Sequence, residues 1–571
     1  MEEKRLRNNI NQASKPLNIQ ASKRGENNFM KMFYRAIVIS GVLAGLVFAA
    51  EGTVYTKLNA PAVTKAESLP LKDKVTQNGI TWTFEKPVRV GQFINGDFYV
   101  VGPVTVTMID PKPLFGDEVK NTLDDKSIKE SLFKGSYARN GSTLNIPAVV
   151  KPNKITKRTS RSGFDSRMDM AAYDPEQFTK IPVNMKPGDS LFSSISNEPL
   201  VGGFSIKALA VLTCLAEAQP ADAFRPSYCK TSSSKIYLAR NLRRDLLLKL
   251  PLPESAAKVK PADANDYFKG VWLDTVGFGR AMPRKAFFGA DISVQAGQAS
   301  LLLLLNYPEA DKEPLLLNMV QVGIDYLGLV RGGASWIGEG GVSSGRKWLL
   351  TFAGLLLDDK EMCTLTKSFP ETRFQEDDQT VFCPVEFMGK KYEKGWTGAK
   401  VIWTGHYGYH DGNFENGSHQ PRKAMDYYGP VELFHPTEWP TPWSQGSEGS
   451  RRSSNSGTWV AEALAARLMH AEKYWDHDAF FAYVDRWMTE DDTPFWGAIN
   501  ANVDKKLAAA KDEKEKKELE AAKAQMARTA KGRTIAGNLA PLVNDLWVKY
   551  RDNLPEGTQK EKTPPAATTW K

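Results

Sequence analysis

The sequence predicts a two-domain protein, with an all-β sandwich near residues 75–228 and an all-α (α/α) toroid or incomplete barrel near residues 232–555. A chain of 571 residues is too long to fold around one small hydrophobic core. Short alternating runs of β-branched and aromatic residues fill residues 78–229. After Cys229 the apolar residues recur at helical spacing instead, and this change of period predicts the domain boundary.

The first fifty residues are predicted to be a polar extension and a signal peptide. Residues 36–50 form a short apolar run that follows Lys31 and Arg35 and closes on small residues. This layout is typical of a secretory signal with cleavage near residues 49–50. We therefore expect export to the periplasm, the cell surface or the medium. A retained anchoring helix and a later start codon stay open as alternatives.

The net charge bears on the class of binding partner, and the cysteines bear on disulfides and zinc sites. The first fifty residues carry eight Lys/Arg and three Asp/Glu, so they hold five of the nine formal net positive charges. A weakly basic mature chain argues against a nucleic-acid partner, which needs a concentrated basic face. In an oxidising compartment the cysteines predict two local disulfides, Cys214 with Cys229 and Cys363 with Cys383. No CxxC spacing occurs, so no zinc site is predicted.

The β region follows a predicted linker at residues 51–74. The run at residues 80–113 is broken by Asn95–Asp97, a hairpin-turn signature, and again by Gly102 and Pro103. Further strands are expected in residues 146–152, 190–196 and 205–218. Alternation predicts a core position for several aromatic residues, and stacking on sugars is the alternative: Trp82, Phe84, Phe93, Phe98 and Tyr99.

The helical region is predicted from apolar residues at i, i+3 and i+4 spacing. Seven segments carry this pattern, at residues 235–250, 291–306, 312–330, 345–359, 457–470, 478–491 and 537–550. The charged, Ala-rich insertion at residues 504–534 predicts a solvated helical protrusion, with a docking arm for a partner as the alternative. Residues 556–571 are predicted to be a disordered tail.

Residues 404–428, "TGHYGYHDGNFENGSHQPRKAMDYY", hold three of the six histidines, and residues 1–405 contain none. Histidine and tyrosine are the usual proton-transfer groups, and glycine-containing turns suit a loop at the mouth of a cleft. We therefore predict a catalytic set of His410 and Tyr428, supported by His406, Tyr427 and His419.

A resemblance extends this prediction. Residues 320–357, "VQVGIDYLGLVRGGASWIGEGGVSSGRKWLLTFAGLLL", and residues 459–487, "WVAEALAARLMHAEKYWDHDAFFAYVDRW", belong to the predicted toroid. The combination of a signal peptide, a β-sandwich and an α/α toroid resembles secreted polysaccharide lyases of the alginate-lyase and heparinase type. In many heparinase-type lyases the toroid comes first, whereas here the β region does.

The resemblance implies cleavage of a uronate-containing, acidic polysaccharide by β-elimination. That reaction needs a base for the C5 proton, an acid for the leaving oxygen and a group that neutralises the carboxylate. The expected substrate-binding residues are Asn413, Asn416, Arg422, Arg280, Arg284, Lys285, Arg346, Trp403 and Trp336. No cofactor is expected, and a structural divalent cation and an oligomer are left open. Membrane contact is expected only through an uncleaved leader.

Three alternatives remain. A glycoside hydrolase on the same scaffold would use a carboxyl pair drawn from Glu339, Asp411, Glu415 and Asp426. A non-catalytic glycan-binding surface protein would use the aromatic loops. A metal site would need His406 and His410 on one helix face, and the glycine and aromatic residues between them disfavour a helix.

Overall fold

The structure is a computed structural model, and it describes residues 68–115, 138–146, 164–165, 175–201, 204–229, 235–274, 289–414, 429–439, 445–527 and 540–555. The chain divides into two compact units, Met1–Glu51 and Gly52–Lys571, and all described residues belong to the second. The predicted signal peptide and C-terminal tail lie outside the described residues. None of the described helices has the length and hydropathy to span a membrane.

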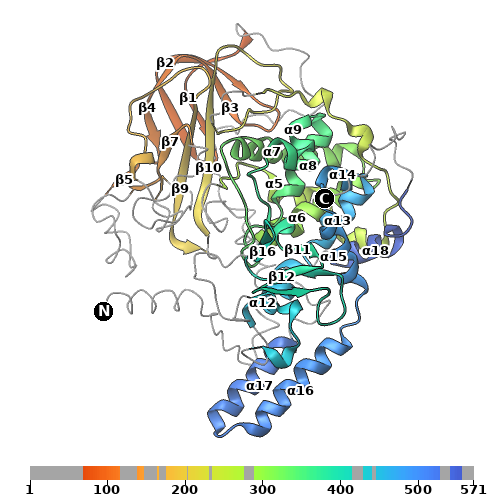
Figure 1. Cartoon of the computed structure of the whole chain (residues 1–571). Coiled ribbons are helices and arrows are strands. Elements are labelled where there is room, and N and C mark those ends of the chain that lie inside the picture. Colours follow the sequence, from red (N-terminus) through yellow and green to blue (C-terminus); the bar gives the residue numbers. More distant parts are fainter. Residues whose placement is uncertain are drawn as a thin grey trace. The chain divides into compact units, whose positions relative to one another are not determined.

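The N-terminal part is one curved eight-stranded sheet, drawn in red to yellow in Figure 1. Its strand order is β7-β9-β10-β3-β2-β4-β8, with β1 paired to β2. The strands are β1 Leu71–Gln77, β2 Ile80–Gln92, β3 Phe98–Val101, β4 Val104–Asp110, β7 Ser142–Leu144, β8 Val183–Met185, β9 Ser190–Val201 and β10 Phe204–Leu215, and β5 Leu114–Phe115 pairs separately with β6 Ala138–Arg139. The predicted Asn95–Asp97 turn is confirmed, because β2 and β3 pair antiparallel across it.

The predicted all-β sandwich is wrong, because the second face of the sheet is covered by helices. Strand β10 explains this arrangement. Its Leu212 and Cys214 face a cluster formed within the sheet, whereas Leu209 and Val211 face the large core that contains the helices. Since successive residues of a strand point to opposite faces, the nearly continuous apolar run of β10 fits a strand that is buried on both sides.

The C-terminal part contains helices and small sheets, so the predicted all-α toroid is wrong as well. Its helices are α5 Pro261–Phe268, α6 Gly289–Leu304, α7 Glu309–Arg331, α8 Arg346–Leu357, α9 Lys360–Cys363, α10 Leu365–Ser368, α11 Gln375–Asp378, α12 Gln445–Ser450, α13 Val460–Leu468, α14 Glu472–Trp475, α15 Asp478–Thr489, α16 Thr493–Ala509, α17 Glu513–Ala527 and α18 Ala540–Tyr550. Three two-stranded sheets lie between α11 and α12, formed by β11 Thr380–Phe382 with β14 Val401–Trp403, β12 Val385–Phe387 with β13 Lys390–Tyr392, and β15 Tyr409–His410 with β16 Asn413–Phe414.

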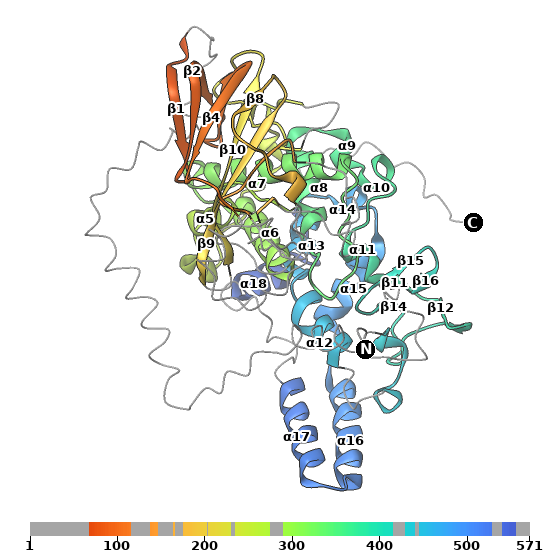
Figure 2. The same ribbon diagram turned by 90° about the vertical axis from the view of Figure 1, so that its left-hand side faces the viewer.

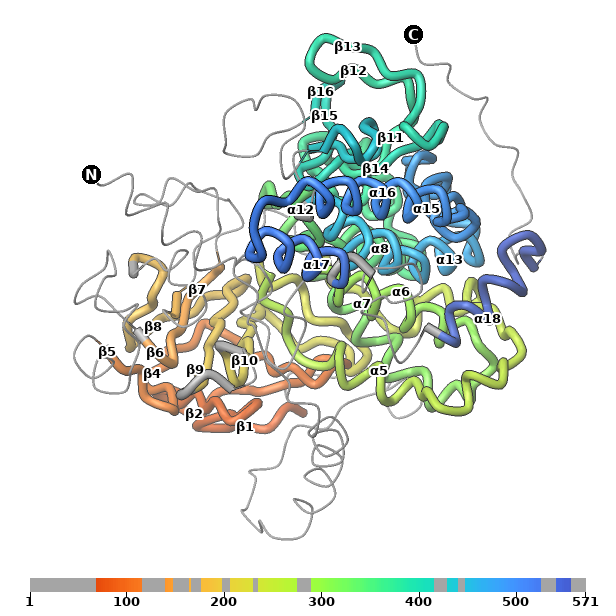
Figure 3. The backbone as a smooth tube through the Cα atoms, turned by 90° about the horizontal axis from the view of Figure 1, so that it is seen from below, coloured from red at the N-terminus to blue at the C-terminus, as the bar shows by residue number. Residues whose placement is uncertain are grey.

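Two pairs of packed helices form the centre of the helical part. Helix α13 packs on α6 and α8 packs on α7, as Figure 3 shows. The predicted helix at residues 235–250 is absent; this segment contains only short 3₁₀ turns, Ala239–Asn241 and Arg244–Leu246. In both Figures 1 and 2 the predicted insertion contributes to an antiparallel pair, α16 and α17, that extends beyond the other helices.

The two predicted disulfides do not form, and no disulfide joins any of the four cysteines. Cys214 belongs to the cluster within the sheet, and Cys229 belongs to the core on its other face. The sheet therefore separates these two thiols. Cys363 ends α9, whereas Cys383 follows β11, and both are partly exposed.

A buried ion network joins the sheet to α7. The Nε of Arg225 donates to Asp97 at 2.6 Å, and its two terminal nitrogens donate to Asp325 at 2.9 and 2.6 Å. The backbone of Arg225 also exchanges two hydrogen bonds with the side chain of Gln321. Burial raises the pKa of Asp325 to about 6 even though Arg225 opposes the shift. Arg225 therefore offsets the free-energy cost of burying the carboxylates of Asp97 and Asp325.

We expect Arg225→Met to lower the free energy of unfolding by about 3–5 kcal/mol at pH 7.5, because two carboxylates lose their buried partner. The loss should shrink at pH 5, where Asp325 takes up a proton. Arg243→Met is the matched control, since its pair with Asp245 is solvent-exposed, and it should cost less than about 1 kcal/mol. Equal losses in the two variants, measured by chemical denaturation, would contradict this account.

Candidate functional site

A loop at Gly338–Lys347, here called the glycine loop, is bound by all four side chains of the one-turn helix α11. The Gln375 side chain makes most of these contacts and is fully buried. Its Oε1 accepts from the backbone N–H groups of Glu339 at 3.3 Å and of Ser343 at 2.9 Å. Its Nε2 donates to the side-chain oxygens of Ser344 and Asn455, each at 2.7 Å. Both ends of this buried amide are thus satisfied, as a buried polar group requires.

The other three side chains of α11 bind the same loop at its ends. Glu376 Oε1 accepts from the N–H of Gly345 at 2.5 Å, and Asp377 forms an ion pair with Lys347. Asp378 Oδ2 accepts from the N–H of Gly338 at 2.9 Å. Burial raises the pKa of Asp378 to about 6, against the opposing effect of its neighbour Arg373. One helical turn therefore fixes both ends and the middle of the glycine loop.

The glycine loop in turn holds the first predicted histidine. The backbone oxygen of His406 accepts from the N–H of Gly340 at 2.9 Å and from Nε2 of Gln379 at 2.8 Å. A Cβ on Gly340 would lie 2.6 Å from the Cε1 atom of His406, so only glycine leaves room for the ring. Nδ1 of the imidazole lies 3.4 Å from Oγ of Ser450, and the ring of Tyr407 packs edge-on at 4.8 Å.

His406 is mostly buried, and burial lowers its pKa to about 4. At neutral pH its imidazole is therefore uncharged, with one nitrogen as donor and one as acceptor. Such a group can accept or donate a hydrogen bond without carrying charge into the site.

The second predicted histidine lies on an exposed hairpin. Strands β15 and β16 are joined by Asp411 and Gly412, whose φ values of 49° and 79° suit a two-residue hairpin turn. Nε2 of His410 lies 3.2 Å from Oδ2 of Asp411, with side-chain exposures of 37% and 86%. The amide of Asn413 donates to the backbone oxygen of Asp411 at 3.0 Å and supports the turn. A histidine beside a carboxylate is an arrangement that orients and activates a base.

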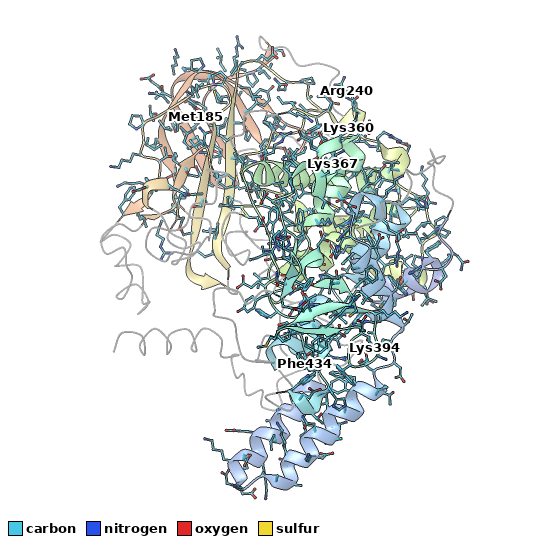
Figure 4. All side chains as sticks on the ribbon, viewed as in Figure 1. Met185, Arg240, Lys360, Lys367, Lys394 and Phe434 are labelled. Atoms are coloured by element: carbon cyan, nitrogen blue, oxygen red, sulfur yellow. The ribbon has the colours of Figure 1, made fainter. Side chains whose placement is uncertain are left out.

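The aromatic support of this hairpin comes from neighbouring strands. Phe414 packs against Tyr409 within the hairpin and against Phe387 of β12. The Phe387 ring also packs on Phe434, which is labelled in Figure 4. Burial raises the pKa of Tyr409, and Glu386 adds to the shift, so its hydroxyl remains protonated at neutral pH.

Three predicted substrate-binding residues are instead part of the core. Arg346 is 2% exposed and binds Asp274 through Nε at 2.8 Å, and Nε1 of Trp336 donates to the same carboxylate at 2.9 Å. Trp403 is fully buried in β14. The predicted contact of these three side chains with substrate is therefore not supported, because all three are buried. The remaining predicted site residues lie outside the described residues: His419, Tyr427, Tyr428, Asn416, Arg422, Arg280, Arg284 and Lys285.

A π-helix at Arg451–Asn455, which sequence reasoning missed, contributes contacts to the site. Its Asn455 contacts Gln375, and Ser450, which precedes it, contacts His406. Such π-turns are often found at functional sites. The only signal in the sequence was the run "GSEGSRRSSNSG" at residues 446–457, whose Ser and Gly content indicates a loop.

The π-helix also contributes to a small pocket. The pocket is lined by Trp396, Thr397, Glu432, Glu448, Arg451, Arg452, Glu490, Asp492 and Phe495. Its two arginines are bound by carboxylates: Arg451 and Arg452 each contact Glu448, at 2.8 and 2.6 Å, and Arg452 also binds Asp492 at 2.6 Å. Four carboxylates against two guanidinium groups leave this lining net negative, so it does not provide a cationic site for an acidic substrate.

Within the described residues, no group of three or more His, Cys, Asp or Glu side chains is arranged to hold a metal ion. No family model matches the chain, and no curated protein or solved structure is similar to it. The site must therefore be interpreted from its own geometry.

We expect Gly340→Ala to displace the His406 ring, because the added Cβ would overlap it. Gly333→Ala is the matched control: both glycines have positive φ, at 61° and 84°, but no atom lies within 4 Å of a Cβ at Gly333. Each variant should lose about 1 kcal/mol from backbone strain. Only Gly340→Ala should also raise the pKa of His406 toward the ordinary value of about 6.5.

An NMR titration of the histidine rings, together with chemical denaturation, checks this prediction. A His406 pKa that is equally low in both variants would contradict the close contact between Gly340 and the ring.

Proposed function

We propose that this chain is an exported enzyme that cleaves a uronate-containing polysaccharide by β-elimination. The observation that carries the proposal is the pairing of His410 with Asp411 on the exposed β15–β16 hairpin. The pair lies in the stretch of residues 404–428, where histidine, tyrosine and amide side chains outnumber carboxylates.

In this proposal His410 takes the C5 proton of the uronate. Asp411 holds the imidazole through Nε2 and stabilises the imidazolium that forms, which leaves Nδ1 for the substrate. The proton that elimination needs at the leaving oxygen comes from a tyrosine, for which Tyr428 is our first candidate. Asn413, exposed at the start of β16, is placed to donate a hydrogen bond to the substrate carboxylate.

His406 has a different role from His410. A pKa near 4 makes its imidazole a poor base at neutral pH, because an efficient base has a pKa near the working pH. We therefore assign it a neutral hydrogen bond to a sugar hydroxyl beside Gly340 of the glycine loop.

The proposal is tested by incubating the mature protein with a panel of uronate polymers. Elimination gives an unsaturated uronate that absorbs in the ultraviolet. Reducing ends without that absorbance indicate hydrolysis, and retention of a polymer without cleavage indicates a glycan-binding protein. Either of these two outcomes, or no effect on any polymer of the panel, contradicts the lyase proposal.

We expect His410→Ala to lower kcat by about a hundredfold or more, the scale of a lost proton-transfer group. Asp411→Asn keeps the shape of the side chain but loses the charge, and it should lower kcat by about tenfold with a shift in the pH profile. His435→Ala is the matched control, since His435 caps a short 3₁₀ turn elsewhere, and it should leave kcat unchanged. Full activity in His410→Ala, with loss only in Asp411→Asn or Glu339→Gln, would favour a carboxyl-pair hydrolase.

A further inference from the structure

Two buried glutamates outside the proposed catalytic set converge on one point of the core. Glu376 of α11 accepts a hydrogen bond from the N–H of Gly345, and Glu462 of α13 accepts one from the hydroxyl of Ser293, each at 2.5 Å. Gly345 and Ser293 touch, since a Cβ on Gly345 would lie 2.4 Å from the Ser293 nitrogen. The two carboxyl groups therefore reach the same contact from two different helices.

This convergence depends on a close approach of α6 and α13. A Cβ on Gly297 would lie 2.3 Å from the nitrogen of Glu462, so glycine is needed where the helices cross. Ser293 lies one turn earlier on α6, and this brings its hydroxyl to Glu462.

Neither carboxyl group has a full set of partners. Both glutamates are completely buried, and the Oε2 atom of each has no hydrogen-bond partner among the described residues. Arg346 of α8, whose positive charge lowers the pKa of Glu376, is itself bound by Asp274. Asp377 of α11 adds a further negative charge and is itself paired with Lys347. The contact that α6 makes with Glu462 is through the neutral hydroxyl of Ser293. Two ionised carboxylates at this point would be very costly.

We propose that Glu376 and Glu462 form a proton-binding pair, here called the acid pair, that attaches the glycine loop to α13 only while the pair keeps at least one proton. Loss of the last proton to hydroxide in the solvent leaves two buried charges, and their repulsion is relieved only when the contact between the glycine loop and α6 opens and water reaches both carboxylates, which also exposes the Gly345 amide. The acid pair thus makes the order of the glycine loop depend on pH. This inference does not rest on the proposed function.

The direction of the effect follows from burial. Burial raises the pKa of Glu376 to about 7 and that of Glu462 well above the ordinary range, and the negative charge of Glu376 adds to the shift at Glu462. Because these values are raised in the folded state, the stability that the pair contributes is complete below about pH 4.5. It is lost as the pH rises through 7 and beyond.

The test is hydrogen exchange at the Gly345 amide in the full chain between pH 7 and 9. After correction for intrinsic exchange, protection should fall as the pH rises in the wild type, by up to about tenfold per pH unit, because opening releases the proton of Glu462. Glu462→Gln keeps the side-chain shape but cannot ionise, so its protection should be flat. Glu520→Gln, on the exposed surface of α17, should behave like the wild type.

Equal slopes in the wild type and in Glu462→Gln would overturn the proposal. A second measurement needs no variant: the infrared band of a protonated carboxyl group should be present in the folded wild type at pH 8. Its absence there would overturn the proposal as well, even if Glu462→Gln does not fold.

Discussion

The four side chains of α11 together bind the beginning, the middle and the end of the glycine loop, and the arrangement of the site depends on these contacts. Gln375 holds the middle of the loop and Asp378 holds its beginning. Because the loop is fixed, Gly340 can support His406 through the backbone and leave space for its ring. The short helix α11 thereby fixes the position of His406 relative to the packed helices.

Buried polar groups stabilise this arrangement of loop and helix. They favour one geometry, and the loss of one partner leaves the other unpaired in the core. A buried amide such as that of Gln375 stabilises the fold only while both of its ends are satisfied, since an unpaired group costs its full desolvation energy. The same reasoning applies to Arg225 between the sheet and α7. In both places polar groups, and not apolar contacts alone, decide how elements far apart in the sequence are joined. The surface hairpin with His410 depends less on burial and has more freedom to meet a substrate.

Periodicity in the sequence predicted the long helices well, because α6, α7 and α8 begin within a few residues of the expected positions. It failed for the sandwich, since an apolar strand such as β10 gives no sign of whether a second sheet or a group of helices covers it. The histidine-rich stretch led to the predictions for His406 and His410, whereas the predicted substrate-binding residues Arg346 and Trp336 turned out to be core residues. Gln375 could not have been predicted, because its partner Asn455 lies 80 residues further along the chain.

The central claim is that the Gln375 amide orders the glycine loop, and hydrogen exchange at the Ser343 amide in Gln375→Leu tests it most directly. The account predicts that Ser343, which donates to Gln375 at 2.9 Å, exchanges about ten- to a hundredfold faster, as expected for one or two lost buried hydrogen bonds. Amides in the middle of α7 should keep their wild-type rates. Unchanged protection of Ser343 in a folded Gln375→Leu variant would contradict the account.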